Sequence, residues 1–225
     1  MARRPKKTAS LKAFEKNLTR ARRFVEVFDA GDLHPEPTKR RGKGQPSKHE
    51  NELLRASVIM GIGTLDAYLS DVAAEVLVAQ LESATSNPGE SARNVLHRVT
   101  KEIDTLPLEL ALVTDPRQRS RIARERIADY LSNRVSNHGP KGVVTTLERM
   151  GCAVDWSAIV VPQDLVTKTA KDPPAALEEW TGKRHQLVHQ GREIQVVRKK
   201  AGGLLDLVDA IAHMVDAAAL AVYSG

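Results

Sequence analysis

Hydrophobic positions recur at helical spacing along most of this chain. From about residue 10 to Ala30, apolar residues step by three or four positions, which predicts an amphipathic helix. A longer periodic segment runs from Ser47 to about Glu82, and its apolar residues lie on more than one side of the helix. We therefore expect residues 47–82 to form the long central helix of a bundle. Small residues along it are expected to let another helix approach closely; they are Gly63, Ala67, Ser70 and Ala74.

The remainder of the chain also has a helical pattern. Further helices are expected over residues 92–104, 117–135, 143–150, 175–191 and 204–221. Residues 152–172 have no clear period and are interpreted as a connection. Because strand-like runs bounded by turns are scarce, the predicted fold class is all-α, a helical bundle.

A basic loop divides the chain. Residues 31–47 are rich in Pro, Gly, Lys and Arg, which is typical of a mobile loop. We expect residues 1–47 to be an appended N-terminal amphipathic helix with this loop, and residues 48–225 to be one helical-bundle domain. The cations of the first helix, which include Lys16, Arg20, Arg22 and Arg23, are interpreted as a solvated face, with contact to phosphates as the alternative.

Composition and charge narrow the class of protein. The chain has 225 residues, of which 41% are hydrophobic and 28% charged, as in ordinary globular proteins. A formal net charge of +6 favours an anionic partner such as nucleic acid, although a solvated basic surface also explains it. The single cysteine, Cys152, excludes an intrachain disulfide and favours a reducing, cytoplasmic setting. No apolar run is long enough for a membrane span, so no membrane partner is expected.

The densest chemistry lies in residues 183–191. His185 and His189 are four residues apart and share a helix face, whereas Arg184 and His189 are separated by roughly 140° around the axis. Histidine transfers protons near neutral pH and arginine offers a fork of donors to phosphate, so the pattern indicates metal-independent cleavage of RNA. Two alternatives remain, a metal held by His185, His189 and Glu178, or a structural pair of surface histidines. Leu187 and Val188 are interpreted as core packing.

The run Arg184-His185-Gln186-Leu187-Val188-His189 resembles the Arg-polar-x3-His signature of the HEPN superfamily, most closely its RiboL-PSP-type branch. The likeness extends loosely over about residues 48–222. It implies a helical bundle that forms a homodimer with both motifs facing one cleft. It also implies an endoribonuclease without metal or other cofactor, in toxin-antitoxin, anti-phage or RNA-processing systems, and an antitoxin protein as a possible partner.

The resemblance assigns roles to particular residues. Arg184 and His189 match the catalytic pair, and His185 matches the polar position. Asp66 is a candidate for a supporting acidic residue, with an ordinary surface aspartate as the alternative. In a symmetric cleft, Arg184 of one chain and His189 of the other would meet one phosphate. The candidate RNA contacts are cations beside the motif and in the basic loop: Lys183, Arg192, Arg40, Arg41 and Lys43.

Two other classes of function compete with the ribonuclease. The first is a non-catalytic HEPN-like module that binds RNA or a protein partner, which the basic arm and loop would serve equally well. The second is a DNA-binding regulator, which is disfavoured because no short helix-turn-helix with an exposed recognition helix is evident.

Overall fold

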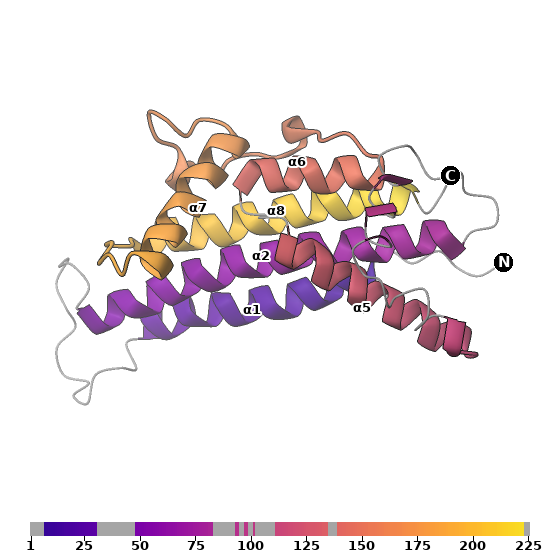
Figure 1. The fold of residues 1–225 in the computed structure, drawn as a ribbon. Helices are drawn as coiled ribbons and strands as arrows, with labels where there is room; N and C mark the ends of the chain where they lie inside the picture. Colours follow the sequence, from indigo (N-terminus) through magenta and orange to yellow (C-terminus); the bar gives the residue numbers. More distant parts are fainter. Residues whose placement is uncertain are drawn as a thin grey trace. The chain divides into compact units, whose positions relative to one another are not determined.

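The computed structural model describes residues 7–30, 48–82, 93–94, 97–98, 101, 111–134 and 139–222, and within them the chain is helical with no strand (Figure 1). This confirms the predicted all-α class. The connection at 152–172 contains only two three-residue 3-10 turns. The elements are α1 (Ala9–Ala30), α2 (Lys48–Glu82), α5 (Pro116–Arg134), α6 (Gly139–Met150), η1 (Trp156–Ala158), η2 (Gln163–Leu165), α7 (Pro173–His189) and α8 (Arg198–Val222).

The chain divides into two compact helical units that each draw on distant parts of the sequence. The first unit comprises Met1–Ala13, Asp66–Asp155 and Ala212–Gly225, and the second comprises Phe14–Leu65 and Trp156–Ile211. Helices α1, α2 and α8 each contribute one part to each unit. The boundary predicted at residue 47 lies outside the described residues and stays a prediction, as does most of the helix expected over 92–104.

Helix α2 is the core element of both units. Its buried apolar side chains are at most 7% exposed, and they lie around the helix rather than along one narrow stripe. In the second unit they are Leu54, Val58, Ile62 and Leu65, and in the first unit they include Tyr68, Leu69, Val72, Ala73, Val76 and Leu77. The expected long helix, covered on more than one side, is therefore confirmed.

In the first unit the N-terminus of α1 is capped by side chains. The hydroxyl Oγ1 of Thr8 accepts a hydrogen bond from the backbone N–H of Leu11 at 3.0 Å, as an N-cap residue does. Thr8 is itself held by Asp216 of α8, which accepts from the Thr8 backbone N–H at 3.3 Å and from its hydroxyl. Thr8 and Asp216 are both almost fully buried. The start of α1 is thus fixed to the end of α8 within this unit.

A second carboxylate completes the cap. Glu75 of α2 accepts from the backbone N–H groups of Ala9 at 3.0 Å and Ser10 at 2.9 Å, both of which lack an intrahelical acceptor. The guanidinium of Arg124 on α5 lies 3.2 Å from Glu75 and donates to the Ser10 hydroxyl at 2.9 Å. The negative charge of Glu75 is therefore balanced by the helix N-terminus and by one arginine.

In the second unit α8 begins earlier than the predicted residue 204. The pair Gly202-Gly203 is a pattern typical of a helix break, yet both residues are helical. A Cβ at Gly203 would lie 3.3 Å from Cγ of Leu165 and 3.4 Å from Cβ of Pro162. The η2 segment packs closely on α8 at this glycine, so a larger residue would require Leu165 or Pro162 to shift slightly.

The close helix approach occurs at Gly61 of α2, two residues before the small-residue strip begins and therefore on a different face of the helix. A Cβ at Gly61 would meet Cδ2 of Leu205 at 2.5 Å, whereas nothing lies within 4 Å of a Cβ at Gly63. Ala67 is exposed. The prediction of the strip was therefore wrong at Gly63 and Ala67, because residue size alone does not say which face of a helix another helix covers.

These two glycines form a matched pair for a stability test. We expect Gly61→Ala to destabilise the protein by about 1–2 kcal/mol, because the added methyl group forces the buried Leu205 side chain to move. Gly63→Ala should stabilise it by about 0.5–1 kcal/mol through helix propensity alone. Urea denaturation monitored by circular dichroism measures both, and changes of the same sign would contradict the close approach at Gly61.

Candidate functional site

Helix α7 carries the Arg184–His189 motif, and its ends have clear physical causes. Asp172 caps the start, since its Oδ1 accepts from the backbone N–H of Ala175 at 2.8 Å, and prolines occupy the first turn. Trp180 lies on the buried face. The end is set by Gly191, whose φ of 59° confirms the predicted left-handed conformation after the helix.

His185 and His189 lie in contact on the exposed surface of α7. Their ring centroids are 4.8 Å apart and the rings are inclined by 41°. Both side chains are exposed. The prediction that the two histidines share one face is confirmed, and two imidazoles are available at the surface to exchange protons with a bound molecule.

Arg184 differs from the histidines in its surroundings. Its side chain is half-buried, and its Nε is buried without a hydrogen-bond partner among the described residues. A buried N–H without an acceptor is unfavourable, so an oxygen that reached it would be stabilised. Helix α7 extends to His189, so the separation of Arg184 and His189 by roughly 140° is kept within one chain.

Lys183 is engaged inside the second unit. Its Nζ donates to Oε1 of Glu179 at 2.5 Å and lies 4.2 Å from the ring centroid of Trp180. The hydrogen bond from Lys183 is the main cause that lowers the pKa of Glu179, which also accepts from Thr167 at 3.2 Å. A contact of Lys183 with RNA stays a prediction, and it would have to compete with Glu179. Arg192 is exposed after the helix end.

The chain that follows α7 is fixed by two polar residues of α2 that sequence reasoning missed. Asn51 pairs with both backbone groups of Val196, donating to its carbonyl at 3.0 Å and accepting from its N–H at 3.3 Å. Arg55 donates to the carbonyl of Ile194 at 2.7 Å. Both side chains are nearly buried. The available signal was their spacing, because they continue the buried repeat of α2 with polar residues, which need partners there.

For four of the predicted site residues the proposed roles stay predictions. Asp66 belongs to the first unit, whereas the motif belongs to the second, so its supporting role stays a prediction. Arg40, Arg41 and Lys43 lie outside the described residues.

The apolar residues within the motif differ from the expectation. Leu187 is half-buried, but Val188 is 42% exposed, so its assignment to the core was wrong. The reason is its place in the last turn of α7, between the two exposed histidines. The motif surface therefore combines two imidazoles with one apolar side chain.

Among the described residues, no group of three or more His, Cys, Asp and Glu side chains is placed to hold a metal ion, and Glu178 makes no such group with the histidines. No helix in the described ranges is long and apolar enough to cross a membrane.

Comparisons with protein-family models, with curated proteins and with solved structures found no match to this chain.

The Lys183–Glu179 pair supports a pH-dependent prediction. The folded-state pKa of Glu179 is lowered, so its contribution to stability is present above the unfolded-state value and is lost as the pH falls through the folded value. We expect Glu179→Gln to lower the unfolding free energy by about 0.5 kcal/mol at neutral pH. The difference from the wild type should shrink as the pH falls below about 4.3.

The neighbouring Glu178→Gln is the matched control, because Glu178 is exposed and pairs with no described residue. Urea denaturation at several pH values measures both variants. An equal, pH-independent effect of the two substitutions would show that the ion pair contributes nothing.

Proposed function

We propose that this chain is a metal-independent endoribonuclease of the HEPN type, in which Arg184 and His189 act as the catalytic pair and His185 supports them. The observation that supports this most directly is the contact of two exposed imidazoles, 4.8 Å apart, on the helix that also carries Arg184. Histidine can transfer protons near neutral pH and arginine can bind phosphate, and here both lie within six residues of one helix.

The proposed reaction needs no group beyond these side chains and the substrate. The ribose 2′-hydroxyl attacks the adjacent phosphorus while a histidine accepts its proton. The bond from phosphorus to the 5′-oxygen then breaks, and that oxygen receives a proton. Arg184 stabilises the negative charge that develops on the non-bridging oxygens. The products are a 2′,3′-cyclic phosphate end and a 5′-hydroxyl end.

We further propose that the working site is shared by two chains. On one α7 the side chains of Arg184 and His189 leave the helix on different sides, because five residues correspond to about 500° of rotation. A symmetric dimer removes this difficulty, since a two-fold axis between two α7 helices places Arg184 of one chain opposite His189 of the other. The exposed Val188 beside the histidines is compatible with contact to another protein surface.

Cleavage of end-labelled RNA in EDTA tests the proposed activity. We expect the wild type to cleave and to leave cyclic phosphate ends, and His189→Ala to lose about 100-fold or more because proton transfer is removed. Arg184→Ala should lose a similar factor through the missing charge stabilisation. His185→Ala should lose less.

His213→Ala is the control, because His213 is also exposed but lies on α8, outside the motif. It should cleave like the wild type. Cleavage that persists unchanged in His189→Ala and Arg184→Ala would come from a contaminating nuclease, and cleavage that requires added divalent metal would overturn the proposed mechanism.

Mixing two inactive variants tests the two-chain site. If Arg184→Ala and His189→Ala chains exchange freely, half of the dimers are mixed, and each mixed dimer has one intact site out of two. Activity should then return to about a quarter of the wild-type value. A site within one chain gives no recovery, because every chain lacks one catalytic residue.

Exchange must be shown separately, by mixing tagged and untagged chains and measuring co-purification. Full activity of a chain that sediments as a monomer would also contradict the shared site.

A non-catalytic module that binds RNA or a partner protein is the second candidate. It is favoured by two observations on α7, the internal neutralisation of Lys183 by Glu179 and the exposure of Val188. A protein partner such as an antitoxin would cover an apolar side chain, whereas a phosphate would not. Binding of RNA without any cleavage, unaffected by His189→Ala, is the result that favours this candidate.

A further inference from the structure

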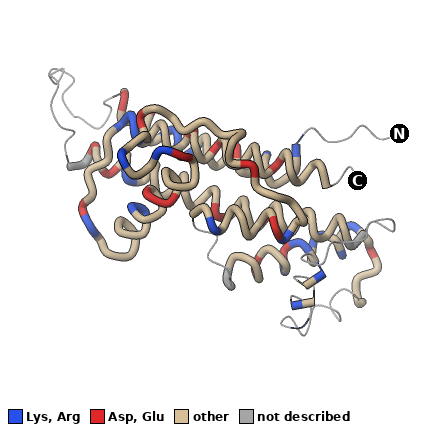
Figure 2. Tube along the Cα trace, turned by 90° about the horizontal axis from the view of Figure 1, so that it is seen from above, with Lys and Arg blue, Asp and Glu red and all other residues tan. Residues whose placement is uncertain are grey.

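The cations of α1 in the second unit fall into two groups. Arg22 is turned toward α8, where Nη1 lies 2.7 Å from Asp206 and Nη2 lies 3.2 Å from Asp209. The other group is Lys16, Arg20 and Arg23, which are all exposed. We call these three residues the basic stripe. Figure 2 shows positive and negative positions interspersed along the helices.

The basic stripe lies on one face of α1. Its members are four and three residues apart, so they lie within an arc of roughly 60° and are separated along the axis by about 6 Å and about 4.5 Å. The opposite face of the helix is buried in the core through Phe14, Leu18, Ala21 and Val25. The three cations therefore stand in single file on the solvent side.

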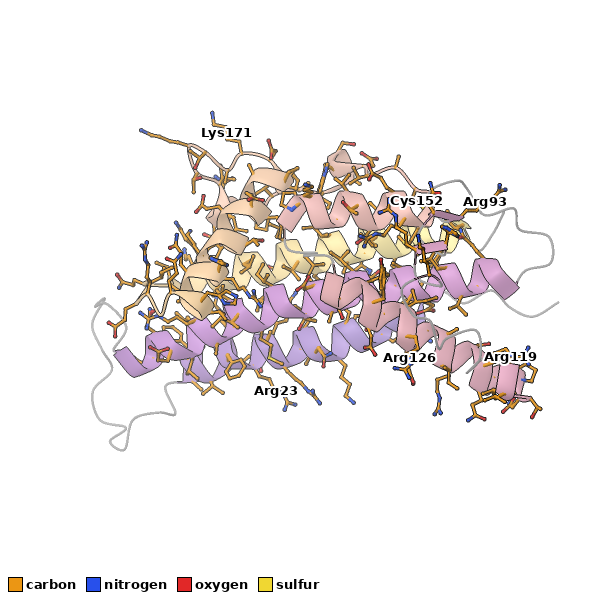
Figure 3. All side chains as sticks on the ribbon, in the orientation of Figure 1. Arg23, Arg93, Arg119, Arg126, Cys152 and Lys171 are labelled. Carbon is orange, nitrogen blue, oxygen red and sulfur yellow. The ribbon has the colours of Figure 1, made fainter. Side chains whose placement is uncertain are left out.

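The charges of the basic stripe are not neutralised by the described residues. Lys16 and Arg23 make no hydrogen bond or ion pair with side chains in the described ranges, and Arg20 only donates to the neutral Asn17 at 3.4 Å. Figure 3 shows the side chain of Arg23 pointing away from the neighbouring helices. On one flank of this face α1 carries Glu26, which is exposed, and Glu15, which is half-buried. Three exposed cations thus stand beside one exposed carboxylate.

We propose that the basic stripe binds the phosphodiester backbone of single-stranded RNA, at a position on α1 distinct from the motif on α7. A nucleic-acid strand carries one negative charge per nucleotide, which suits cations in single file. A membrane surface is disfavoured, because the apolar face of α1 is already buried in the core and is not free to insert. The inference rests on the proposed function in taking RNA as the polyanion, and it adds a binding element outside the catalytic residues.

The salt dependence of binding tests the proposal. The full chain is titrated against fluorescent single-stranded 2′-O-methyl RNA, which lacks the attacking hydroxyl and is not cleaved. We expect the combined variant Lys16→Gln, Arg20→Gln, Arg23→Gln to bind more weakly. Its slope of log K against log salt should be shallower by about 2, because each phosphate contact on a single strand contributes about 0.7.

Arg22→Gln is the matched control, because it removes one positive charge from the same helix. It should lower stability without changing the salt slope, since Arg22 is bonded to Asp206 and Asp209. Thermal melting shows whether the triple variant is folded. If it is not folded, the three single substitutions replace it, and each is expected to change the salt slope by about 0.7.

If the triple variant has the same slope of log K against log salt as the wild type, the proposal that the basic stripe binds RNA is wrong. Equally strong stripe-dependent binding to polyglutamate or to anionic vesicles overturns the assignment to RNA. The two proposals fail in different ways. If RNA binding depends on the basic stripe but no RNA is cleaved, only the proposed nuclease activity is wrong. If RNA is cleaved but the salt slope of the triple variant is unchanged, only the proposed role of the basic stripe is wrong.

Discussion

The constraint on which the structure depends is the apolar surface of α2. A 35-residue helix with buried side chains around its circumference cannot stand in water, so it has to be covered along its whole length. The covering elements come from distant parts of the sequence and approach as closely as side-chain volume allows, as Gly61 and Leu205 show. Two polar residues of α2 hold other segments: Asn51 is bonded to the backbone of Val196, and Glu75 is bonded to the start of α1.

In the first unit, burial also changes the pKa values of ionisable side chains on α2. Burial raises the pKa of Tyr68 well above its usual range, and the nearby carboxylates of Asp216 and Glu75 add to the effect. Burial also raises the pKa of Asp71, and Arg124 opposes that shift. The carboxylates of Glu75 and Asp216 are met by a helix N-terminus, a hydroxyl and a guanidinium. In the second unit the Nε of Arg184 is buried without a partner among the described residues, as is the Oγ1 of Thr146 in the first unit.

The spacing of residues along the sequence predicted the features that depend only on residues close together in the chain. The helical period identified α1, α2, α5 and α7, and the four-residue spacing placed His185 beside His189. The sequence could not show what depends on packing between distant segments. The start of α8 before Gly203, the close approach at Gly61 and the role of Asn51 all require knowing which residues meet, and periodicity does not contain that information.

Net charge is another property of the sequence that does not show which residues meet in the structure. A value of +6 indicates an anionic partner but treats every cation alike. In the structure Arg22, Lys183 and Arg198 are each held by a carboxylate of their own unit, and Asp29 raises the pKa of Arg198 through its hydrogen bonds. Such cations stabilise the fold, and binding a phosphate would require breaking an existing ion pair. Cations without a partner, as in the basic stripe, release only counterions when an anion binds, so they determine where a polyanion is bound. The location of unpaired charge, rather than its total, is therefore the useful guide to where a polyanion would bind.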